Sequence, residues 1–230
     1  FRSPSTTTGT NITLPSYAEN ELLNAEKRIS AVKSTTSISF TFITDLHGDT
    51  GPSLAPLVNI DTFRKTAAVG LSNFGVYGGD TFTGLTEDFT TGKVLWNLDF
   101  YLSRMNGADF PVFFTRGNHD CNSRYQRAKT LTGQQYYDHV LSSMHAAAVF
   151  DQDHPEGDYY YADLAEKKLR VIVLNAFTGK NYVFGYGEDQ LKFVAEEALD
   201  LSDKEDPEEW QVLFTGHVAD TTYVHDEIPY

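Results

Sequence analysis

Short apolar runs separated by amphipathic segments extend through the first half of the chain. Apolar runs bounded by polar residues predict buried strands at residues 39–44, 74–77 and 111–115. Between them, residues 61–72 and 93–105 have the apolar spacing of helices that pack on one face, and Asp61 is the candidate N-cap of the first. Strands that alternate with helices favour parallel pairing in a βαβ arrangement.

The second half of the chain has a different pattern. Residues 134–150 and 188–199 have helical periodicity. Residues 159–163 and 169–175 predict two antiparallel strands, and residues 211–215 predict the last strand. We therefore predict an α/β fold, a layered sandwich of two mixed β-sheets flanked by helices, with the second sheet beginning in this half.

The N-terminal residues differ in composition from the rest of the chain. Residues 1–15 are rich in Ser, Thr, Gly and Pro, which is typical of a tail. The spacing from Ser16 to Glu19 matches a capping box at the start of a helix. We therefore expect a tail and lead-in helix over residues 1–36 and one domain over residues 37–230.

Composition and charge restrict the class of protein. Hydrophobic residues make up 40% of the 230 positions, enough for a sizeable core, and no apolar run approaches the ~20 residues of a membrane span. The net charge of −14 argues against a nucleic-acid-binding surface, although bound cations would let an acidic cleft accept a small phosphorylated substrate. The single cysteine, Cys121, slightly favours a cytoplasmic location, and no feature identifies a partner protein.

Polar motifs follow four of the predicted strands. They are Asp45-Leu46-His47, Gly79-Asp80, Gly117-Asn118-His119-Asp120 and Gly216-His217. Because the ends of neighbouring parallel strands meet at one edge of a sheet, we expect these side chains to converge. One loop can direct both Asp45 and His47 to one cation, and the Asp80 carboxylate has an oxygen for each of two cations. Asn118 and His217 would add an amide oxygen and an imidazole nitrogen.

These ligand types indicate the kind of metal and a proton donor. Oxygen and nitrogen ligands without thiolate suit two divalent ions of Mn, Fe, Zn or Ni, and do not distinguish among them. His119 stands next to Asp120, and an imidazole oriented by a carboxylate is suited to protonate a leaving oxygen. Each of these residues alone could be a turn residue. Together they indicate a two-metal site, and two-metal sites mostly act on phosphate esters. Loop 81–90, rich in Thr and Phe, could form one wall of the site.

The ordered set of motifs resembles that of the calcineurin-like metallophosphoesterases, the superfamily of purple acid phosphatases and protein phosphatases. The resemblance covers about residues 40–217 and rests on D-x-H, G-D, G-N-H-D and a later His in that order. It implies hydrolysis of a phosphomonoester or phosphodiester through a metal-bridging hydroxide. It also implies that His119, oriented by Asp120, stabilises or protonates the leaving group.

The same resemblance implies how the ligands divide between the two metals. Asp45 and His47 would hold the first metal. Asp80 would bridge, and Asn118 and His217 would hold the second metal. These five residues therefore form the predicted metal site.

The sequence departs from the family pattern after His217. The family's closing G-H-x-H motif is absent, thirteen residues follow His217, and His225 does not match the motif. We therefore expect a domain truncated before its last motif, a second sheet incomplete at the C-terminus, and impaired metal binding and activity in this form. The alternative is a non-catalytic module derived from a phosphoesterase, used for assembly in a viral tail or a cell-surface protein.

Overall fold

The computed structural model of the protein describes residues 13–48, 54–69, 72–83, 91–120, 131–144, 147–177 and 185–217. Most of the predicted tail, Cys121 and His225 lie outside these ranges. The four motifs that carry the predicted site lie inside them, so their geometry can be compared with the predictions.

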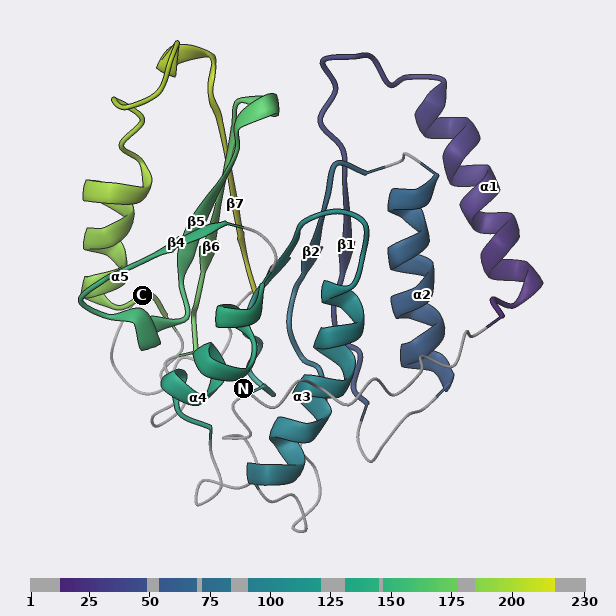
Figure 1. The fold of residues 1–230 in the computed structure, drawn as a ribbon, viewed down its shortest axis with the longest axis horizontal. Helices are drawn as coiled ribbons and strands as arrows, with labels where there is room; N and C mark the ends of the chain where they lie inside the picture. The colour runs from purple at the N-terminus through teal and green to yellow at the C-terminus, as the bar shows by residue number, and fades with distance from the viewer. Residues whose placement is uncertain are drawn as a thin grey trace, which may run out of the picture.

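Two β-sheets form the centre of the molecule (Figure 1). The first sheet is parallel and has the order β1 (Phe40–Ile43), β2 (Phe74–Tyr77), β3 (Val112–Phe114). The second has the order β4 (Ala148–Phe150), β5 (Tyr160–Leu164), β6 (Leu169–Leu174), β7 (Gln211–Gly216). Its pairs are antiparallel except for β6 with β7. The predicted α/β sandwich of two sheets is confirmed, although the first sheet is parallel rather than mixed over its described strands.

Helices flank both sheets. The α-helices are α1 (Ser16–Ser30), α2 (Leu54–Ala68), α3 (Thr91–Asn106), α4 (Gly133–His139) and α5 (Glu188–Phe193). A π-helical turn (Val194–Ala198) continues α5, and short 3₁₀ turns lie at Leu141–Ser143, Pro155–Gly157, Ala165–Lys167 and Pro207–Glu209. Figure 1 shows α1 and α2 beside the first sheet and α5 beside the second. None of the described helices is long and apolar enough to cross a membrane.

Three apolar clusters hold these layers together. The largest joins inward residues of both sheets to α2 and α3, and includes Val76, Phe113, Tyr160, Val171, Leu98 and Ile60. A second cluster attaches α1 to α2 through Leu22 and Val58, and a third attaches α5 to β6 through Phe193 and Ile172. Because burial of apolar surface is the main favourable term in folding, the central cluster determines how the two sheets face each other.

One predicted helix start and one predicted capping box are wrong, because a polar residue was taken for a helix cap. The predicted helix over residues 61–72 begins upstream of Asp61, whose carboxylate accepts hydrogen bonds from Arg104 Nε at 3.0 Å and Nη2 at 2.8 Å. The spacing from Ser16 to Glu19 is no capping box, since α1 has Pro15 at its N-cap and no side-chain cap hydrogen bond. In neither case does the predicted polar side chain cap the helix.

The predicted helix over residues 134–150 is wrong in its second half. Helix α4 ends at His139, and after a 3₁₀ turn the chain forms β4, which pairs with β5. The helix itself begins with a complete capping box between Thr132 and Gln135. The β5 strand, distant in sequence, provides the backbone partners that make β4 a strand, and apolar spacing alone does not reveal them.

A buried ion pair joins the two sheets beside the third motif. Arg116, which follows β3, donates through Nη1 to the carboxylate of Asp158, which precedes β5. Its Nη2 donates to the Leu131 carbonyl oxygen at 3.2 Å, and its guanidinium carbon lies 5.3 Å from the centre of the Tyr136 ring. Burial outweighs the attraction of Arg116 and raises the pKa of Asp158 to about 7.

This pair predicts a pH-dependent stability. Because the pKa of Asp158 is higher in the folded protein than in the unfolded chain, raising the pH from about 4 to about 7 favours unfolding. Asparagine has nearly the shape of a protonated aspartic acid. The free energy of unfolding of Asp158→Asn relative to the wild type should therefore rise between about pH 4 and about pH 7, added to a pH-independent cost of removing the charged partner of Arg116. Urea unfolding across this range measures the difference, and a variant that instead loses relative stability with rising pH would contradict the expectation.

Candidate metal centre

The loop after β1 runs beside the loop after β2. The Asp45 N–H donates to the Gly79 carbonyl oxygen at 3.0 Å, and the His47 N–H donates to the Asp80 carbonyl oxygen at 3.2 Å. These hydrogen bonds extend the parallel pairing of β1 with β2 beyond the ends of the strands. The first two motifs therefore have a fixed register relative to each other.

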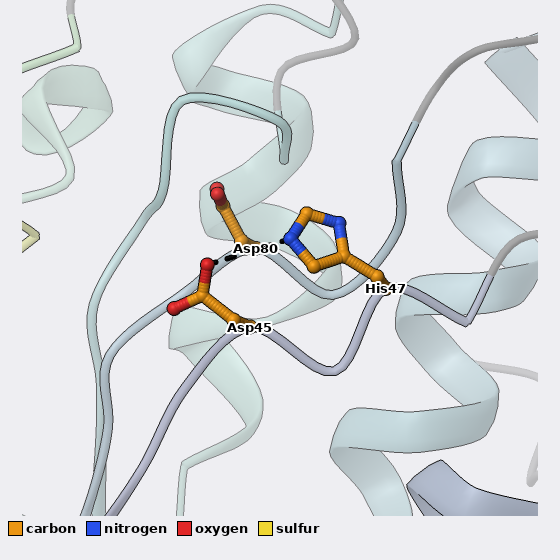
Figure 2. A group of neighbouring side chains, drawn as sticks. All are labelled: Asp45, His47 and Asp80. Atoms are coloured by element: carbon orange, nitrogen blue, oxygen red, sulfur yellow. Dashed lines mark ion pairs between the residues drawn. The ribbon is translucent and has the colours of Figure 1, made fainter.

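The side chains of Asp45, His47 and Asp80 converge, as Figure 2 shows. One ligand atom from each lies within 4.8 Å of the other two, and His47 Nε2 is 3.4 Å from Asp45 Oδ1. Two atoms that each lie about 2.1 Å from one ion can be at most about 4.2 Å apart. The separation of Asp45 and His47 is therefore short enough for a shared cation, and their role as ligands stays a prediction.

The backbone at these residues is strained. Asp45, His47 and Asp80 have positive φ angles of 56°, 46° and 59°, a region that residues with a β-carbon rarely adopt. Such conformations cost on the order of 1–3 kcal/mol each and cluster at functional sites, where the surrounding fold enforces them. Asp158, Lys168 and Asp206 have similar φ angles in other turns, so the strain indicates a site here only together with the neighbouring ligand atoms.

Two glycines bring the second and third motifs into contact. Gly79 has a φ of +94°, and a β-carbon built on it would lie 2.4 Å from the Gly117 nitrogen. A β-carbon on Gly117 would lie 2.2 Å from Asp80 Oδ1. Neither position can accept a larger residue without moving the turn that carries Asn118. Gly79 and Gly117 are the glycines that precede Asp80 and Asn118 in the second and third motifs.

Asp120 has different partners from the predicted one. The sequence predicts that it orients His119, but its carboxylate accepts three backbone N–H groups. These are Gly117 at 2.8 Å, Asp80 at 3.0 Å and Thr81 at 2.8 Å. Asp120 thus ties the second motif to the third, and the residue that orients His119 is Thr83, through its carbonyl oxygen.

Two histidines present the same nitrogen to Asp80. His119 Nδ1 donates to the Thr83 carbonyl oxygen at 2.7 Å, and His217 Nδ1 donates to the Gly78 carbonyl oxygen at 2.6 Å. Because a carbonyl oxygen can only accept, each Nδ1 carries a proton and each neutral ring has its lone pair on Nε2. These Nε2 atoms lie 3.9 Å and 3.7 Å from Asp80 Oδ2. The tautomer of His217 is the one that a metal ligand binding through Nε2 requires.

Asp80 lies at the centre of this arrangement. Its Oδ1 accepts the His119 N–H at 2.9 Å, which leaves Oδ2 directed toward the two imidazoles. The residue is 3% exposed, and burial, followed by the negative charge of Asp120, raises the pKa of Asp80. Cations bound beside it would offset the buried charge, so the carboxylate and imidazole donors fit the two divalent metals that the sequence predicts.

The remaining residues at the site are one predicted ligand and two residues that the sequence did not single out. Asn118 is half-buried in the turn that also holds His119. Thr83 belongs to the loop predicted to form a wall, but its contacts with both histidines were not foreseen. Phe177 is buried, with its ring centre 5.4 Å from that of His217. The sequence signal that could have identified Phe177 is its position shortly after β6, since residues after strand ends line such sites.

One family profile and several solved structures match this chain. The sequence profile of the calcineurin-like phosphoesterases matches residues 38–228. Among solved structures, a dimetal phosphatase from Danio rerio is 15% identical with a TM-score of 0.55, over 79% of this chain and 69% of that one. That likeness is one of fold.

A purple acid phosphatase from yellow lupin (Lupinus luteus) seeds is 14% identical to this chain, with a TM-score of 0.46. The match covers 79% of this chain and 31% of the lupin chain. No curated protein sequence matches the chain.

Proposed function

The chain belongs to the calcineurin-like phosphoesterase family, and we propose that it hydrolyses a small phosphomonoester or phosphodiester with two bound divalent cations. The proposed metal ligands are Asp45, His47, Asp80, Asn118 and His217, and the proposed proton donor is His119. The observation that carries this proposal is the position of Asp80, whose Oδ2 faces the Nε2 atoms of His119 and His217. One carboxylate at the centre of several donors is the arrangement that a two-metal site needs.

The cations and the side chains would have separate tasks. When bound, the two cations would offset the charge of the phosphate and activate a water molecule as the nucleophile. Asp45 and His47 would hold one ion from the loop after β1, and His217 would hold the other from the end of β7. The hydrogen bonds of Asp120 to the backbone at Asp80 would keep these loops in place during the reaction.

His119 would donate the proton that the leaving oxygen needs. Its Nδ1 proton is held by the Thr83 carbonyl oxygen, so the second proton of the imidazolium form resides on Nε2. That nitrogen faces Asp80, on the side where the phosphate would bind. A positioned general acid of this kind typically contributes about 10²–10⁴-fold to the rate.

The proposal is tested with the Mn²⁺-loaded protein and two substrates that differ only in leaving group. His119→Gln is expected to slow hydrolysis of phenyl phosphate by about 10²–10⁴-fold and hydrolysis of p-nitrophenyl phosphate much less. The reason is that p-nitrophenolate leaves readily without a proton. Bis(p-nitrophenyl) phosphate, assayed in parallel, separates diesterase from monoesterase activity.

A matched control is His139→Gln, because His139 pairs with Asp99 at 3.2 Å on the surface of α4 and α3. This variant should leave all rates unchanged. Equal losses for both leaving groups in His119→Gln would contradict the role of His119. A protein that binds Mn²⁺ or Zn²⁺ but hydrolyses none of the three esters would contradict the proposed activity and favour the non-catalytic module.

A further inference from the structure

We infer that Thr83 positions two histidines of the site at once: its hydroxyl holds His47 as a ligand through Nε2, and its carbonyl holds His119 as the proton donor. This inference rests on the proposed function for its consequences, although the positioning itself can be measured without metal or substrate. Thr83 is neither a proposed ligand nor in the reaction, so it is a positioning residue.

The contacts of Thr83 come from two different groups. Its Oγ1 lies 3.2 Å from His47 Nδ1, and its carbonyl oxygen accepts the Nδ1–H of His119 at 2.7 Å. The two rings meet edge to face, with centres 5.1 Å apart and planes at 82°. Thr83 therefore lies against the Nδ1 side of both rings, and both Nε2 atoms are directed toward carboxylates of the site.

His47 depends on this contact more than His119 and His217 do. Its side chain is 35% exposed, compared with 8% for His119 and 15% for His217, so packing restricts its ring least. The last torsion of a histidine side chain is broad and roughly two-fold. To bind a cation, the ring must direct Nε2 toward the site. The Thr83 hydroxyl, which can donate to Nδ1 or accept from it, holds the ring in this orientation, and it can accept the Nδ1 proton when Nε2 binds a cation.

The two contacts can be separated by substitution. Thr83→Val keeps the shape of the side chain and the backbone carbonyl but removes the hydroxyl, so it should release His47 and leave His119 held. Thr83→Ser retains the hydroxyl and should restore the wild-type behaviour. Thr62→Val is the matched control, because the Thr62 hydroxyl donates within α2 to the Val58 carbonyl oxygen at 2.7 Å.

The first measurement uses metal-free protein. Long-range ¹H–¹⁵N correlation spectra of the imidazoles at about pH 8.5, where histidines are neutral, report which ring nitrogen carries the proton. In the wild type, His119 and His217 should carry it on Nδ1, because their Nδ1 atoms face carbonyl oxygens. In Thr83→Val, the imidazole signals of His47 should shift and broaden because its Nδ1 loses the hydroxyl, while those of His119 stay unchanged.

The second measurement is calorimetric titration of each variant with Mn²⁺. Thr83→Val should weaken one of the two binding events by about 10–100-fold, the usual effect of removing a partner of a metal-bound histidine. Thr83→Ser and Thr62→Val should bind as the wild type does. The weaker event should be the one that His47→Gln also removes.

The outcomes separate this inference from the proposed function. If Thr83→Val leaves the imidazole signals of His47 unchanged, or binds Mn²⁺ as tightly as Thr83→Ser does, the positioning role of the hydroxyl is wrong, whatever the enzyme hydrolyses. A change in the His119 tautomer in Thr83→Val would also overturn it, because the backbone contact should survive. If the wild type binds no Mn²⁺, the proposed function fails while the spectra still decide the role of Thr83.

Discussion

Asp80→Asn is expected to abolish the thermal stabilisation that Mn²⁺ gives the wild-type protein, without lowering the stability of the metal-free form. The asparagine oxygen can still accept the His119 N–H that Asp80 Oδ1 accepts at 2.9 Å. The substitution removes a negative charge that is buried beside Asp120, and burial raises the pKa of Asp80, so the charge itself costs stability when no cation is bound. Differential scanning fluorimetry with and without Mn²⁺ measures both effects.

The expected magnitudes follow from linkage. At a free Mn²⁺ concentration about 100 times the Kd, one bound ion stabilises the wild type by about 2.7 kcal/mol, and this increment should disappear in the variant. Hydrolysis should fall by more than about 100-fold, because even an outer partner of a ligand costs 10–100-fold.

Asp61→Asn is the matched control, since Asp61 is a buried carboxylate in an ion pair with Arg104 outside the site. This variant should have a lower midpoint without metal and an unchanged Mn²⁺ increment. A full Mn²⁺ increment in Asp80→Asn would contradict the central place of Asp80.

Arg170→Met is expected to destabilise the folded protein by about 1–3 kcal/mol, a large part of the total stability of many domains. Arg170 is buried in the second sheet and binds both carboxylate oxygens of Asp163, at 2.7 Å and 2.9 Å. It also donates to the carbonyl oxygens of Ala198 and Asp200, where the π-helical turn ends, and lies 4.1 Å from the centre of the Tyr161 ring. Methionine fills similar volume but removes these donors. Asp163 is half-buried and keeps its ion pair with Lys204 at 3.0 Å, so the main loss is the donor to the Ala198 carbonyl oxygen and the contact with the Tyr161 ring.

Urea unfolding followed by circular dichroism measures this loss. Arg170→Lys keeps the charge but not the planar fork, so it should lie between Arg170→Met and the wild type. Lys168→Met is the control, two positions before Arg170. Lys168 pairs with Asp206 and Glu209 at the surface, so its loss should change the free energy of unfolding little. Equal losses for Arg170→Met and Lys168→Met would contradict the role of the buried fork.

The strands that carry the site could be predicted because their signals are local. Residues 74–77 were predicted as a strand with the bounds that β2 has, and Asp80 follows them as expected. The antiparallel pairing of β5 with β6 was also predicted and is confirmed. A buried strand needs a short apolar run and a turn at its end, and both are properties of consecutive residues.

The errors arose where a distant segment decides the local structure. Residues 148–150 continue a helical pattern in the sequence but form β4, because β5 offers an edge to pair with. Asp61 looked like a helix cap and is instead the partner of Arg104, 43 positions away. Asp120 looked like the partner of the adjacent His119 and instead binds the backbone at Asp80, 40 positions away.

By itself the sequence determined which residues can bind cations and that each follows the end of a strand, since residue type and strand pattern are fixed by neighbouring positions. The tertiary structure alone decided which atoms face each other. Thr83 reaches His47 and His119 from 36 positions away on either side, and His217 reaches the Gly78 carbonyl oxygen across 139 positions. Such contacts depend on how two packed sheets bring loop backbones together, and no local pattern of residues encodes those distances.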